Sequence, residues 1–172
     1  MCSIQAGDVW NMLLHLCRWL QNNSFIVAIN GTPWTAAALE IVHYFSMFIL
    51  VGTMVVVDLH VLGLLGRRRE AGQLANQLYP WMWASLVLNF LSGFLMFAGS
   101  AASYYGNDIF YDKGIVIVLA ILASVIVQQK VRKWDELPAM PAWGKLIAFV
   151  SIGLWIGAII AGVEVPALTG LG

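Results

Sequence analysis

Four apolar stretches, each long enough to cross a lipid bilayer, constrain this 172-residue chain more than any other feature of its sequence. They lie at about residues 34–65, 81–98, 109–127 and 146–163. About 20 helical residues cross the roughly 30 Å hydrocarbon layer, and only helices and closed barrels satisfy their backbone hydrogen bonds there. We therefore predict an all-α membrane protein, a four-transmembrane-helix bundle that forms one membrane domain over residues 1–172.

Composition supports the same class. Charged residues make up 10% of the chain and hydrophobic residues 60%, whereas a soluble domain carries about 25% charged residues. The lipid bilayer is thus the expected partner, and a net charge of zero argues against nucleic acid as one.

Residues 8–22 have the pattern of an amphipathic helix. Their polar residues fall on one narrow stripe at helical spacing: Asp8, Asn11, His15, Arg18 and Asn22. This pattern predicts an interfacial helix that lies on the membrane surface, with His15 in solvent. The first residues lack a signal-peptide pattern, so we expect the N-terminus to be retained.

The basic residues indicate an orientation. Seven of the nine Lys and Arg residues lie in the first and third loops between spans, among them Arg67, Arg68, Arg69 and several residues of 128–145. Basic loops face the cytoplasm. We therefore expect a multi-pass protein of the bacterial inner membrane with both termini in the periplasm. In the first loop, Pro80 is expected to open the second span.

Ionisable residues within a membrane span suggest function, because burying them in lipid is costly. On the first span, at about 100° per residue, Glu40, His43 and Asp58 project in similar directions, so we expect this stripe to face protein. His60 lies 17 residues from His43, about 26 Å along a helix. The two histidines would sit near opposite membrane faces, as do the haem ligands of membrane b-type cytochromes.

Haem b held by His43 and His60 as metal ligands is therefore one hypothesis. A six-coordinate haem needs further axial ligands, for which His15, Met96 or a partner subunit are candidates. Glu40 would orient the His43 imidazole. The alternative is that His43 bonds Glu40 or a neighbouring helix and has only a packing role.

Two further stripes indicate helix contacts. On the second span Asn89 shares a face with Ser85, Ser92 and Met96, and an amide in mid-membrane needs an interhelical partner. We expect this face to lie opposite the Glu40/His43 stripe, where a quinone is a second possible cofactor. On the fourth span Gly153, Gly157 and Ala161 form a ridge of small residues that predicts close helix packing.

A family resemblance rests on Trp19-Leu20, Glu40-x-x-His43, Gly52, Asp58-Leu59-x-x-Leu62-Gly63, Gly93 and Phe110-x-x-Lys113. With these residues the chain resembles an uncharacterised family of bacterial four-helix inner-membrane proteins and, more distantly, the copper-resistance protein D and cytochrome b561-like group. Members of the family often have Arg where this chain has His60. Some have a histidine near the end of the third span, where this chain has Gln128-Gln129. The resemblance implies the four-helix fold, and it implies haem binding at His43 alone.

The favoured functional hypothesis is a small integral-membrane subunit that supports electron transfer, with haem b or quinone bound near Glu40 and His43, and with Asn89, Met96 and His60 as further site residues. The alternative is a non-catalytic membrane anchor or scaffold subunit of a larger complex. Common enzyme motifs are missing from the sequence, so we do not expect an enzyme on its own. Other membrane subunits or further copies of the chain are the expected protein partners. Cys2 and Cys17 have no metal-ligand spacing, so their role is open.

Overall fold

The apolar stretches form long helices in the computed structural model, which describes residues 6–65, 71–105, 107–137 and 139–169. The helices, in chain order, are α1 (Ala6–Gln21), α2 (Ser24–Gly31), α3 (Pro33–Leu62), α4 (Ala71–Gly99), α5 (Ala101–Tyr104), α6 (Asp108–Asp135) and α7 (Ala142–Thr169). Within these residues, α3, α4, α6 and α7 are long and apolar enough to cross a membrane, and no strand occurs. The predicted all-α, four-span fold is confirmed.

The helices fall into two compact units. Unit 1 comprises Met1–Ser46 and Val87–Asn107, and unit 2 comprises Met47–Leu86 and Asp108–Gly172. Helices α3 and α4 each contribute one part to each unit, whereas α6 and α7 belong to unit 2 alone.

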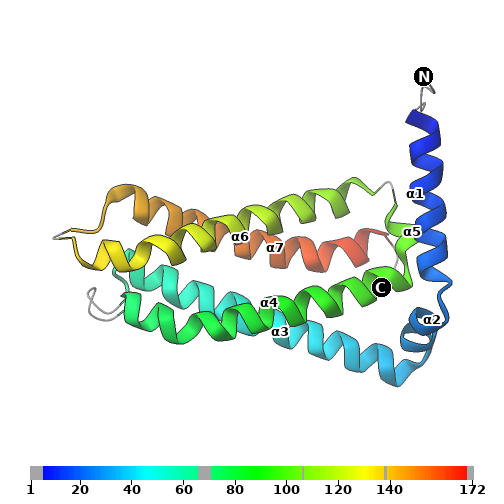
Figure 1. Cartoon of the computed structure of the whole chain (residues 1–172), viewed down its shortest axis with the longest axis horizontal. Helices are drawn as coiled ribbons and strands as arrows, with labels where there is room; N and C mark the ends of the chain where they lie inside the picture. The colour runs from blue at the N-terminus through cyan, green and yellow to red at the C-terminus, as the bar shows by residue number, and fades with distance from the viewer. Residues whose placement is uncertain (1–5, 66–70, 106, 138, 170–172) are drawn as a thin grey trace. The chain divides into compact units, whose positions relative to one another are not determined.

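Within unit 1, α1 runs across the direction of α3 and α4 (Figure 1) and contacts α2 and α5. The Tyr105 hydroxyl donates to the carbonyl oxygen of Trp10 at 2.8 Å. The Gln21 side chain accepts from the backbone N–H of Ala102 at 3.2 Å. The predicted surface helix 8–22 thus corresponds to α1, and its apolar side chains, such as Trp19, remain exposed.

The link from α2 to α3 is built on polar side chains. Asn23 caps α2 by accepting from the N–H of Phe25, and Pro33 is the first residue of α3. Asn30, near the end of α2, donates to the carbonyl oxygen of Leu95 on α4 at 3.2 Å. It packs so closely against Gly99 that a Cβ there would lie 2.6 Å from its amide carbon. Glycine is therefore needed where α2 meets α4.

In unit 2, α6 and α7 pack side by side in opposite directions (Figure 1). Their buried positions repeat every three or four residues: Ala120, Ser124, Val127, Val131 and Trp134 on α6, and Gly144, Ala148, Ser151, Trp155 and Ala158 on α7. This spacing is the seam of an antiparallel pair of helices that pack knobs into holes. Large side chains meet small ones across it. Trp134 lies against Gly144, and Trp155 Nε1 donates to Ser124 Oγ at 3.0 Å.

The seam corrects the prediction for the ridge of Gly153, Gly157 and Ala161. A Cβ at Gly153 would meet nothing within 4 Å, and one at Gly157 would meet only Val116 at an ordinary 3.8 Å. The ridge is therefore not a tight contact within this chain. Small residues also occur on the neighbouring face of α7, and that face is the one that packs.

Several predicted span limits were too short, because a helix continues beyond the apolar residues that identify it. The second span begins at Ala71, and Pro80 lies inside α4 rather than at its start. Asp135, at the end of α6, accepts from the backbone N–H of Gly72 in the first turn of α4. This cap and the burial of Ala71 and Ala75 stabilise the turns before Pro80 against the cost of a proline in a helix.

The first and third spans differ from their predicted ends in opposite ways. Helix α3 ends at Leu62 rather than at residue 65, because Gly63 takes a positive φ of 80°, a conformation that glycine adopts without steric cost. Helix α6 continues through residues 128–135, which were expected to form a loop. Arg67, Arg68 and Arg69, on which the predicted orientation partly depends, lie outside the described residues, as does Cys2.

Candidate functional site

The imidazole of His43 lies between α3 and α4 in unit 1. Its Nδ1 is 3.2 Å from the carbonyl oxygen of Asn89 and 3.1 Å from Ser92 Oγ. A carbonyl oxygen only accepts hydrogen bonds, so the tautomer with its proton on Nδ1 fits this contact. The structure thus brings His43 of the first-span stripe against Asn89 and Ser92 of the second-span stripe.

The neighbouring side chains connect the same two helices. The Asn89 amide donates to the carbonyl oxygen of His43 at 2.9 Å and to Ser46 Oγ at 3.3 Å. Ser46 donates to the same carbonyl oxygen at 2.8 Å, and Ser92 donates to Leu88 within its own helix. We call His43, Ser46, Asn89 and Ser92 the His43 cluster. It satisfies polar groups that lipid would leave without partners.

Gly93 brings the backbone of α4 against the imidazole ring. A Cβ at this position would lie 3.0 Å from Cε1 of His43 and 3.4 Å from Nδ1. The contact leaves no room for another group between this edge of the ring and α4. A ligand of His43 would therefore have to approach from the Nε2 side.

The other sequence-predicted ligands do not all gather at this cluster. Glu40 and His15 are exposed, so the expectation that Glu40 faces protein is not met within this chain. Met96 is partly buried on α4, one turn beyond Ser92. His60 is buried, with 8% of its surface exposed, and it belongs to unit 2. The described residues contain no group of three or more His, Cys, Asp or Glu side chains that would hold a metal ion.

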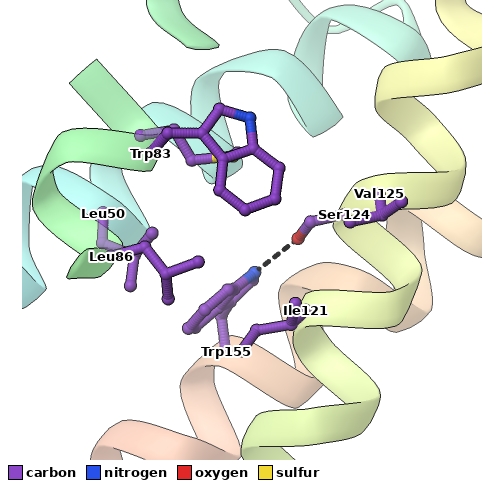
Figure 2. A pocket seen from close by; sticks show the side chains of 8 residues that line it. Leu50, Trp83, Leu86, Ile121, Ser124, Val125 and Trp155 are labelled. Atoms are coloured by element: carbon purple, nitrogen blue, oxygen red, sulfur yellow. Dashed lines mark hydrogen bonds between the residues drawn. The ribbon is translucent and has the colours of Figure 1, made fainter. Parts of the chain in front are cut away.

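Unit 2 contains a small cavity beside the hydrogen bond between Trp155 and Ser124 (Figure 2). Trp83, Leu86 and Ile121 are among the apolar side chains that line it. Its volume of about 10 Å³ corresponds to roughly one water molecule. This cavity is therefore too small for a quinone headgroup.

The fold and these contacts define a class: a multi-pass α-helical membrane protein whose polar span residues join its helices. Residues 18–166 match the model of a family of unknown function, DUF6644. The match covers most of the chain, so the chain belongs to this family. No curated protein and no solved structure shows significant similarity to it.

Sequence reasoning missed a second set of polar residues, which lies in unit 2. Asp58, named from its place on the first span, has Tyr79 and Ser151 as neighbours from two other helices. A serine in an apolar span and a tyrosine next to a proline give no local signal of such a meeting. Only the arrangement of the helices reveals it.

Proposed function

We propose that the chain is a small integral-membrane subunit that acts as a non-catalytic anchor or scaffold in a larger complex. The observation that carries the proposal is the His43 cluster, in which the strongest candidate ligand of the sequence makes contacts between helices. Nδ1 and the neighbouring ring edge of His43 lie against Asn89, Ser92 and Gly93. A polar residue that specifies how two membrane helices pack makes contacts of this kind with the neighbouring helix.

The proposal includes a location and an orientation. The basic residues of the first and third loops favour the bacterial inner membrane, with both termini and α1 on the periplasmic side. The exposed apolar side chains of α1, such as Trp10 and Leu16, support a helix that rests in the lipid interface. Partner subunits would bind to the lipid-facing surface of the spans.

Electron transfer through haem b is the second candidate, and one observation favours it. A ring N–H directed at a backbone carbonyl is the usual arrangement in histidines that bind metal through the other nitrogen. Nδ1 of His43 lies 3.2 Å from the carbonyl oxygen of Asn89, so Nε2 would be the nitrogen that binds the haem iron. The second ligand would come from Met96 or from a partner subunit, and the bound group would supply one-electron chemistry.

One experiment separates the two candidates. The full chain, expressed with haem supplied and purified with any partner subunits, is examined by reduced-minus-oxidised absorption spectroscopy. Under the scaffold proposal the wild type shows no haem bands, and His43→Ala lowers the free energy of unfolding by about 1–3 kcal/mol. His15→Ala, at an exposed histidine of unit 1, is the matched control and should change neither property. A b-type spectrum in the wild type that His43→Ala removes would overturn the scaffold proposal.

A further inference from the structure

Among the described residues of unit 2, the buried side-chain oxygen atoms without hydrogen-bond partners include Asp58 Oδ2, Tyr79 OH and Ser151 Oγ. The side chains come from α3, α4 and α7, and 2%, 8% and 0% of their respective surfaces are exposed. Leaving a buried polar group unsatisfied costs about 1–3 kcal/mol, and more when the group is charged. Native proteins rarely leave such groups without a partner.

The three groups are neighbours. The Ser151 hydroxyl lies beside the Asp58 carboxyl group, although neither Ser151 Oγ nor Asp58 Oδ2 forms a regular hydrogen bond. Tyr79 lies within electrostatic range of Asp58 and of Arg132. The carboxyl group and the two hydroxyl groups thus come from three helices of unit 2, with Ser151 beside Asp58 and Tyr79 within electrostatic range of it.

Among the described residues, Arg132 is a cation that acts electrostatically on Tyr79. Arg132 is exposed, and its Nε donates to the Asn76 side chain at 3.1 Å. Ionisable residues within membrane spans mark ion pathways, proton relays and ligand counter-ions. Asp58 lies four residues before the end of α3 at Leu62, so the site is about one turn from the end of its helix and close to the headgroup region.

We propose that Asp58, Tyr79 and Ser151 form a buried binding site for a small monovalent metal cation such as Na⁺. Carboxylate and hydroxyl oxygens are the ligands that hard cations prefer. A single carboxylate balances one positive charge, whereas a divalent ion would leave a net charge buried in the span. The site lies in unit 2 and is independent of the function proposed for the His43 cluster in unit 1.

The test measures thermal unfolding of the purified full chain in detergent, in NaCl, KCl or LiCl against choline chloride at equal ionic strength. A bound metal cation stabilises the folded state by mass action, so at least one of these salts should raise Tm in a concentration-dependent way. Asp58→Asn should abolish the increase. Glu40→Gln, which removes an exposed carboxylate from the same helix, should retain it.

Two further variants keep the test decisive if Asp58→Asn does not fold. Ser151→Ala and Tyr79→Phe each remove one ligand atom, and each should raise the half-saturating salt concentration about tenfold, which corresponds to 1.4 kcal/mol. An equal Tm in all four salts, or a salt response that Asp58→Asn retains, would overturn the proposal.

A pH series in choline chloride covers the remaining outcome; among the described residues, Tyr79 interacts electrostatically with Asp58 and with Arg132. A Tm that depends on pH through Asp58, without any response to metal cations, would show that the carboxyl group takes up a proton. That result would also overturn the cation site.

Discussion

His43 shows how much a single polar residue in a span depends on its neighbours. In water its ring nitrogens would find partners anywhere, whereas in lipid the partners must come from protein. Asn89 and Ser92 supply them from α4 at 3.2 and 3.1 Å. The ring therefore determines which faces of α3 and α4 meet in unit 1.

Gly93 provides the first prediction at the residue scale. Gly→Ala in a helix gains about 1 kcal/mol of helix propensity, but a Cβ at Gly93 would lie 3.0 Å from the His43 ring. Overpacking typically costs about 1–3 kcal/mol. Gly52 on α3 is the matched control, because a Cβ there would meet nothing within 4 Å. Chemical unfolding should find Gly93→Ala less stable than Gly52→Ala by about 1–3 kcal/mol, and equal stabilities would show that the contact is not tight.

The contact between His43 and Asn89 was predictable, because polar residues within two apolar spans have few alternatives to each other. The exposure of Glu40 was not predictable from the sequence. Helical geometry places Glu40 near His43 in projection, yet Glu40 lies toward the start of α3, where a carboxylate has the headgroup region within reach. The neighbours of Asp58 were also hidden, because they come from α4 and α7.

At the scale of elements, the α6–α7 seam shows why apolar helices are hard to orient from sequence. In a soluble protein a helix has a polar face toward water, so its opposite, apolar face is the buried one. In a membrane the residues that face lipid are as apolar as those that pack against protein, so this contrast is lost. Helix α7 carries small residues on two adjacent faces. The side chains of α6 determine which of these two faces packs. Trp134 of α6 lies against Gly144, and Ser124 of α6 accepts a hydrogen bond from Trp155.

This choice of face leads to a second prediction. In Gly144→Leu the side chain would enter the space of Trp134, whose ring atoms lie 3.3 Å from the Cβ position. We expect the variant to lose about 1–3 kcal/mol of stability or to give less folded protein. Gly153→Leu, on the outward ridge, should be at least as stable as the wild type, because leucine has the higher helix propensity. The reverse order in denaturant titrations would mean that the ridge, and not the seam, packs.

At the scale of the whole molecule, each unit has its own set of polar residues. Unit 1 contains the His43 cluster, and unit 2 contains Asp58, Tyr79 and Ser151. The family match over residues 18–166 includes both sets. The number of spans was predictable because lipid thickness sets a minimum apolar length. The helix ends were not predictable, because they do not depend on hydropathy alone. A cap such as Asp135 extends a helix, and a turn such as that at Gly63 ends one.

We conclude that polar side chains within the spans join the helices of this protein. A double-mutant cycle of His43→Ala and Ser92→Ala, measured by unfolding the full chain in mixed micelles, tests it most directly. Interhelical hydrogen bonds in membranes average about 0.6 kcal/mol and reach about 1.7 kcal/mol, so we predict a coupling free energy in this range. His43→Ala paired with Thr35→Ala, two turns earlier on the same helix, should be additive. Additivity within about 0.3 kcal/mol for His43 and Ser92 as well would contradict the account.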